Sequence, residues 1–164
     1  MGVLTDCFRA PDAAAVVQSL EETDGGSPLF AEPPLLDGVD AKGVDPAVVL
    51  GRPIAVILRT EWRVDLVEQT TVRPPSPAPG REGPESEEGP RATGPWVSEL
   101  HPQVRDTPAG VRDSEVPAVV ARWVQAEELE GASAGNTQPL AEGLFRLARR
   151  ARDADEQLYC WMSP

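Results

Sequence analysis

Three side chains in this sequence could support nucleophilic chemistry: Cys7, His101 and Cys160. A histidine beside a cysteine can accept the thiol proton and leave a nucleophilic thiolate. Both cysteines, however, lie in apolar, strand-like runs, where a buried structural cysteine is the usual case. We therefore predict no catalytic residues. If the strands that carry the cysteines are neighbours, the thiols approach each other, and we expect packing rather than a bridge because a reducing compartment is expected.

The residue types also predict no metal site and no cofactor. A structural zinc site needs four Cys or His ligands at close spacing, and this chain has three such residues in all. Residues 37–43 faintly resemble a calcium loop, but Ala41 and Val48 stand at the fifth and twelfth positions of the EF-hand pattern. We interpret this segment as turns. Glycine-rich phosphate loops and the Gly-x-Ser-x-Gly elbow are absent from the sequence.

Aromatic and basic side chains are the candidate contacts for a ligand or partner. The predicted contacts are Trp62, Trp96, Arg146, Arg149 and Arg150. Trp96 directly follows a stretch rich in proline and glycine, so it is the best candidate for an exposed aromatic. The arginines crowd the second half of a predicted helix, where cations interact well with the helix dipole. A solvated helix face is the alternative interpretation of the arginines.

Net charge restricts the partners. The chain carries 27 acidic and 15 basic residues, which gives a net charge of −12. Phosphate groups repel such a surface, so we expect neither general nucleic-acid binding nor attachment to an anionic membrane. A basic protein partner fits the charge, and the alternative is that the charge only keeps the protein in solution. The composition does not indicate whether the protein is a monomer or an oligomer.

Residues 1–10 lack the basic start and apolar run of a signal peptide. No stretch approaches the roughly 18 apolar residues of a membrane helix. We therefore expect a cytoplasmic protein.

A break in the hydrophobic pattern divides the chain. Residues 74–95 contain seven prolines, four glycines and four glutamates. Such a segment cannot bury enough surface to offset the entropy of ordering it, so we expect a mobile insert. The blocks on either side are each marginal in size for independent folding. We predict one domain over residues 1–164, with both blocks sharing one core; two small domains are the alternative.

Apolar periodicity predicts helices and strands on both sides of the insert. The predicted elements are a strand at 3–8, a helix of about twelve residues from 11, a helix from 45, a strand around 62–72, a helix at 114–130, a helix from 139 and a strand at 158–162. The apolar run 54–58 either continues the second helix beyond a kink at Pro53 or forms a buried strand. Together these elements predict an α+β domain with about four helices on a small mixed sheet that contains both terminal strands.

The two ends of the chain resemble a known group of proteins. The sequence opens Met1-Gly2-Val3-Leu4 with Phe8 and a helix near Asp12, and it closes with a helix, the polar turn 153–157 and an apolar strand. In these segments and in residues 38–50 the chain resembles a family of actinobacterial proteins and, more remotely, the YfbM-like family of bacterial proteins. The resemblance implies an α+β domain in the bacterial cytosol. It implies no site residues, because the family has no established activity.

Two functions are consistent with the sequence. The first is a non-enzymatic interaction protein, a regulator or an immunity-type protein that binds a basic partner. The second is a small-molecule enzyme or ligand-binding domain that uses carboxylates and tryptophans. A cavity that joins at least two carboxylates to Trp62, Trp96 or Trp161 would favour the second.

Overall fold

A five-stranded antiparallel sheet forms the centre of the computed structural model, in the strand order β2-β1-β5-β4-β3. The structure describes residues 4–41, 45, 47, 50–75, 89–125 and 134–164. The strands are β1 (Leu4–Ala10), β2 (Gly38–Asp40), β3 (Gln69–Arg73), β4 (Trp96–Leu100) and β5 (Gln157–Ser163). The N-terminal and C-terminal strands are therefore neighbours, and the predicted α+β class is confirmed. All the strand pairings are antiparallel, whereas the sequence led us to expect a mixed sheet.

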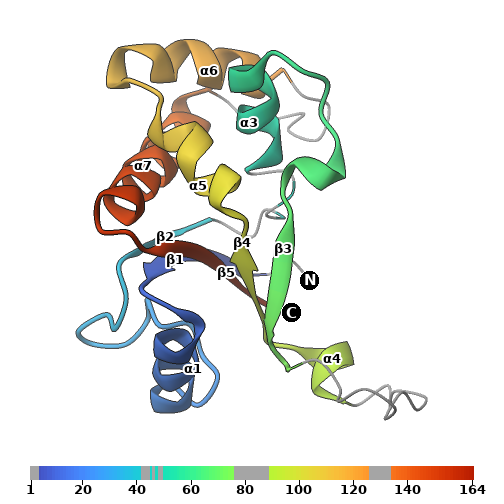
Figure 1. Ribbon diagram of the computed structural model, residues 1–164, viewed down its shortest axis with the longest axis vertical. Helices are drawn as coiled ribbons and strands as arrows, with labels where there is room; N and C mark the ends of the chain where they lie inside the picture. Colours follow the sequence, from blue (N-terminus) through green and yellow to red (C-terminus); the bar gives the residue numbers. More distant parts are fainter. Residues whose placement is uncertain (1–3, 42–44, 46, 48–49, 76–88, 126–133) are drawn as a thin grey trace.

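Most residues of β1, β4 and β5 are buried, because helices lie on both sides of the sheet (Figure 1). The helices α3 (Gly51–Leu58), α5 (Pro102–Ala109), α6 (Val116–Trp123) and α7 (Ala134–Asp153) lie on one side, and α1 (Ala13–Glu22) lies on the other. Successive residues of a strand point to opposite faces. Accordingly Cys7 and Cys160 belong to the larger core beneath α7, while Phe8 and Tyr159 belong to the smaller core beside α1.

The larger core draws residues from both sides of the Pro- and Gly-rich segment. Ile54 of α3 packs in the same cluster as Val104 of α5 and Leu144 of α7. Most of the segment, residues 76–88, lies outside the described residues, so its predicted mobility stays a prediction. Near its end the short helix α4 (Pro90–Thr93) forms before β4. Regular structure therefore begins within the predicted insert.

Several elements differ from the prediction, each for a local reason. Residues 54–58 are helical, so the strand alternative is wrong, and Pro53 lies within the first turn of α3, where its missing N–H has no helical partner to lose. The strand expected from residue 62 begins only at Gln69, after a 3-10 turn at Val64–Leu66. Helix α7 begins at Ala134, ahead of Pro139, because its buried apolar stripe outweighs one lost backbone hydrogen bond.

Two elements carry too weak a pattern to be read from sequence. Helix α5 has few apolar side chains, and it is initiated instead by Pro102 at its first position and by His101, whose side chain accepts a hydrogen bond from the Gln103 N–H. Strand β2 has three residues and falls in the segment interpreted as turns. Of the helix expected at 114–130, the described part is α6, which ends at Trp123; residues 126–130 lie outside the described residues. Within the described part of the chain, no helix has the length and apolar character to span a membrane.

Candidate functional site

A cavity of about 360 Å³ opens between the end of α3, the turn after it and the end of α6. Its size falls in the range of small-molecule sites. We call it the arginine cavity. Its lining residues are Arg52, Ala55, Val56, Arg59, Thr60, Trp62, Arg122, Trp123 and Gln125. Three guanidinium groups thus line one cavity of a protein with a net charge of −12.

The turn after α3 places Trp62 back against the start of that helix. Arg59 ends the helix in the left-handed conformation, with φ 54° and ψ 43°. The indole Nε1 of Trp62 then donates a hydrogen bond to the Ala47 carbonyl at 3.3 Å. The guanidinium carbon of Arg52 lies 4.6 Å from the centre of the Trp62 ring, which is cation–π geometry. A flat ring and a cation are therefore held together before any ligand arrives.

Replacing Gly51 with alanine should disturb this arrangement. A Cβ there would lie 2.9 Å from Trp62 Nε1 and 3.3 Å from a Val67 methyl group. Alanine gains about 1 kcal/mol of helix propensity over glycine, but displacing the hydrogen-bonded indole opposes that gain. We expect Gly51→Ala to shift the tryptophan emission maximum, because Trp62 is the tryptophan that the new Cβ would contact. Gly143→Ala, whose Cβ would meet only Val39 methyl groups at 3.4 Å, is the control and should leave that emission unchanged.

Arg59 and Arg122 line the arginine cavity without an ion-pair partner among the residues that the structure describes. Neither guanidinium has a hydrogen bond or an ion pair within the described part of the chain, and both side chains are exposed. Arg122 lies in the last turn of α6, where the helix dipole favours a cation. Carboxylates pair with most other described arginines. The arginines with such partners are Arg9, Arg63, Arg105, Arg112, Arg146, Arg149, Arg150 and Arg152.

A second cavity, of about 660 Å³, adjoins the arginine cavity and shares Val56, Arg59 and Arg122 with it. Its other lining residues include Ile57, Leu58 and Val119, so much of its wall is apolar. Arg59 and Arg122 therefore lie between the arginine cavity and this second cavity, whose lining also includes Glu115.

Of the two tryptophans predicted as contacts, only Trp62 lines the arginine cavity. Trp96 starts β4 beside α4, is half-buried, and its Nε1 donates a hydrogen bond of 2.8 Å to the Arg91 carbonyl. The structure does not bring these two side chains together. Trp123 and Trp161 are buried. The sequence suggested a site of tryptophans and carboxylates, whereas the cavity around Trp62 combines tryptophans with arginines.

The three predicted arginines of α7 each bind a different carboxylate. Arg146 pairs with Glu142 at 3.4 Å, and Arg149 pairs with Asp113 at 2.8 Å while also donating to the Val111 carbonyl. Arg150 contacts Asp37 through Nε at 2.7 Å. They therefore form no shared cationic patch within the described residues, and their contact with a ligand or partner stays a prediction.

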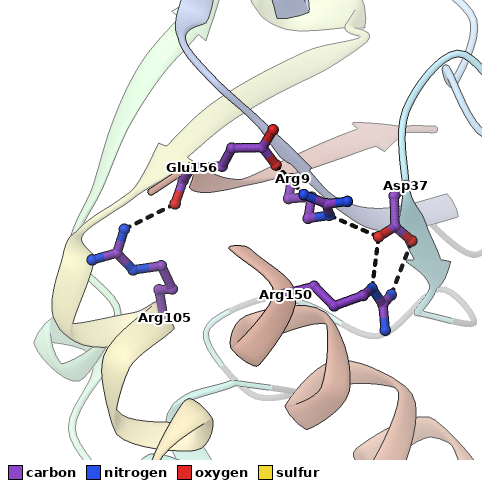
Figure 2. Close-up of polar contacts among 5 residues, drawn as sticks. All are labelled: Arg9, Asp37, Arg105, Arg150 and Glu156. Atoms are coloured by element: carbon purple, nitrogen blue, oxygen red, sulfur yellow. Dashed lines mark hydrogen bonds and ion pairs between the residues drawn. The ribbon is translucent and has the colours of Figure 1, made fainter. Parts of the chain in front are cut away.

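Asp37 belongs to an ionic network that joins β1, α5, α7 and the turn before β5 (Figure 2). Its carboxylate accepts hydrogen bonds from Arg150 and from Arg9 Nε at 2.7 Å, and Arg9 also pairs with Glu156. Arg105 donates to the Glu156 backbone carbonyl at 2.9 Å. The hydrogen bond from Arg150, followed by that from Arg9, lowers the pKa of Asp37 below its ordinary value.

The Asp37→Asn variant should reveal this network through its pH dependence. A carboxylate whose pKa is lower in the folded state stabilises the protein above its unfolded pKa of about 4, and this stabilisation is lost as pH falls through the folded pKa. Because the Asp37 side chain is 37% exposed, we expect a loss of only about 1 kcal/mol at pH 7, measured by urea unfolding. The wild type should lose more stability than the variant between pH 5 and 3, so the two curves converge in acid.

Asp65→Asn is the matched control, since Asp65 pairs with Arg63 across two exposed side chains. Its stability at pH 7 should stay close to that of the wild type. Equal acid sensitivity in the Asp37→Asn variant and the wild type would show that the network does not depend on this carboxylate.

The candidate nucleophile and its base show no contact in the described part of the chain. The thiols of Cys7 and Cys160 contact each other, and His101 caps α5. No group of three or more potential metal ligands occurs among the described residues.

Sequence reasoning did not identify Arg52, Arg59 or Arg122 as site residues. One signal was present: Arg52 and Arg59 are seven residues apart, which places them on one face of a helix two turns apart. That signal required a helix over 54–58, which the sequence left open. No family model, curated protein or solved structure matches this chain. The resemblance to the actinobacterial and YfbM-like proteins therefore stays a prediction.

Proposed function

We propose that this protein binds a small organic anion that carries a flat ring, and that it does so at the arginine cavity. The observation that carries the proposal is the pair Arg59 and Arg122, which have no carboxylate partner among the described residues, beside the Arg52–Trp62 stack. This is a ligand-binding function, with arginines in the place where the sequence suggested carboxylates.

Charge supports an anionic ligand. Like charges that share a cavity repel one another, and a bound phosphate or carboxylate relieves that repulsion while accepting directed hydrogen bonds from guanidinium groups. Carboxylates outnumber basic residues in this chain by 27 to 15, yet none of the described residues that line the arginine cavity is acidic. Among the structurally described lining residues the charge is therefore positive, in a protein whose net charge is −12.

Aromatic side chains support a ligand with a ring. The indole of Trp62 is half-buried, and the small side chains Ala55 and Thr60 line the same cavity. A planar group can stack beside an indole with a gain of the order of 1 kcal/mol beyond the area that it buries. The anionic group would lie between Arg59 and Arg122, because these two residues line both cavities.

Titration with matched probes tests this function. AMP and phenyl phosphate combine a ring with a charge, adenosine has only the ring, and inorganic phosphate has only the charge. We expect the two aromatic phosphates to quench tryptophan emission and raise the unfolding midpoint more than either partial probe. The Arg59→Ala/Arg122→Ala double variant should bind them about 100-fold more weakly, since two charge-assisted contacts are lost.

Arg63→Ala is the control, because Arg63 is exposed, pairs with Asp65 and does not line the cavity. It should bind the probes as the wild type does. Equal affinity of the double variant and the wild type would contradict the proposal, as would the failure of both aromatic phosphates to bind.

A second candidate function is binding of a basic partner, and one surface favours it. Strand β3 is an edge of the sheet, and the cavities beside it contain Glu68, Glu99 and Glu21. An edge strand can accept an extended segment of another protein, and the flanking carboxylates would suit lysine and arginine side chains. A pull-down from lysate at low and high salt tests this: the wild type should retain a basic protein that high salt and the Glu21→Gln/Glu68→Gln variant both release. Recovery of salt-insensitive proteins alone would count against it.

A further inference from the structure

Cys7 and Cys160 lie directly opposite each other on the neighbouring strands β1 and β5. Their sulfur atoms are 2.9 Å apart, and the residues are 1% and 0% exposed. In sequence they are 153 residues apart, so only the pairing of the two terminal strands brings them together. The flanking pairs Asp6–Trp161 and Phe8–Tyr159 keep the same register, which fixes the juxtaposition.

This placement meets the geometric requirement for a crosslink. Residues directly opposite in an antiparallel pair have Cα atoms about 4.5 to 5.5 Å apart, and disulfides span Cα separations of about 4.4 to 6.8 Å. We propose that Cys7 and Cys160 form an intrachain disulfide. The oxidant is a low-molecular-weight disulfide such as oxidised glutathione, which reacts with the two thiols. The crosslink would join the first strand of the described chain to the last.

The chemistry is a two-step thiol–disulfide exchange. One cysteine thiolate attacks a sulfur of oxidised glutathione, so that a mixed disulfide forms and one glutathione thiolate leaves. The second cysteine thiolate then attacks the protein sulfur of the mixed disulfide and expels the second glutathione thiolate. The two cysteines lose two electrons and two protons in total, and the oxidant is reduced to two molecules of glutathione.

Burial determines when this exchange happens. The hydrogen bond with Cys7, followed by desolvation, raises the pKa of the Cys160 thiol above its ordinary value, and Asp45 and Asp6 act in the same direction. Thiolate is the reacting form, so the folded protein should exchange slowly. The crosslink therefore forms while the chain folds or when the strands separate, and burial then shields it from reductants.

Refolding tests the proposal. Wild-type protein refolded with excess oxidised glutathione should lose two hydrogen atoms in intact mass, show no free thiol after denaturation and remain a monomer on a non-reducing gel. The oxidised form should unfold about 5 to 10 °C above the reduced form, because a crosslink that closes a long loop constrains the unfolded chain. Cys7→Ser, Cys160→Ser and the double variant should show no such dependence on redox conditions.

A kinetic measurement distinguishes a shielded crosslink from an exposed one. Reduction of the oxidised protein by dithiothreitol should accelerate at least about tenfold in urea concentrations just below the unfolding midpoint, since local opening exposes the sulfurs. Two free thiols in wild-type protein refolded under oxidising conditions would overturn the proposal. Disulfide-linked dimers, or glutathione retained on one cysteine, would also overturn it.

Discussion

Replacing Gly38 with alanine is expected to destabilise the protein by about 3 kcal/mol, the upper end of the usual cost of overpacking. A Cβ at this position would lie 2.5 Å from the Cys7 backbone carbonyl oxygen, 2.7 Å from a Leu29 methyl group and 2.8 Å from the Phe8 Cβ. The carbonyl belongs to the backbone of β1, so it cannot move aside as a flexible side chain could. Strand β2 must therefore separate from β1, and urea unfolding followed by circular dichroism measures the cost.

The Gly38→Ala change should also affect the ionic network, because Asp37 directly precedes Gly38 and its backbone carbonyl accepts a hydrogen bond from the Arg9 N–H at 3.0 Å. Gly110→Ala is the matched control: a Cβ there meets only carbonyl oxygens, at 3.6 and 3.7 Å, and φ is −76°. Its stability should stay within about 0.5 kcal/mol of the wild type. If Gly38→Ala were equally mild, β2 would not lie against β1 as described.

Trp123→Ala should cost about 4 kcal/mol, in the range observed when a buried aromatic side chain is truncated. Trp123 is the largest of the fully buried side chains, with 1% exposure, and it belongs to the core cluster that includes residues of α3, α5 and α7. The substitution leaves a void beside α6 and removes one wall of the arginine cavity. Thermal unfolding should show a lower midpoint, and AMP titration of the same sample should show weaker binding.

Trp62→Ala separates the two roles of these tryptophans. Trp62 is half-buried, so its truncation should cost less stability than that of Trp123, while it removes the ring on which we expect the ligand to stack. We expect AMP binding to weaken by about tenfold in a protein that remains folded at 25 °C. Unchanged AMP binding by Trp62→Ala would place the ligand elsewhere, and this result is independent of the outcome for Trp123.

Elements with a strong local pattern could be predicted from sequence. Helix α1 has an apolar face at Val16 and Leu20, and Asp12 accepts a hydrogen bond from the Ala15 N–H as its N-terminal cap. Strand β5 is a continuous apolar run because helices cover both faces of its sheet. In both cases the pattern that predicts the element lies in residues close together in the sequence. Strand β2 lacks it, since its three residues are held by pairing with β1 rather than by their own propensity.

The site was harder to predict than the fold. Trp62 was among the predicted contacts as an aromatic side chain that could line a ligand site, but its arginine neighbours were not predicted. Arg52, in the first turn of α3, lies over the indole of Trp62. Arg122 lines the same cavity from α6, sixty residues after Trp62 in the sequence. Conversely, Arg150 looked available in the sequence, and its carboxylate partner, Asp37, is 113 residues away. Which arginines are paired depends on contacts that sequence spacing does not encode.

By itself the sequence determined the α+β class, the placement of the terminal strands in a sheet and the strong acidity of the surface, because periodicity and charge are properties of neighbouring residues. Only the tertiary structure decided that Cys7 faces Cys160 and that Asp37 pairs with both Arg9 and Arg150. It also decided that Arg59 and Arg122 lie beside one cavity with no ion-pair partner in the part of the chain that the structure describes. The physical reason is that ion pairing and thiol contact act over a few ångströms. The folded chain sets such distances between residues that can be more than 100 positions apart.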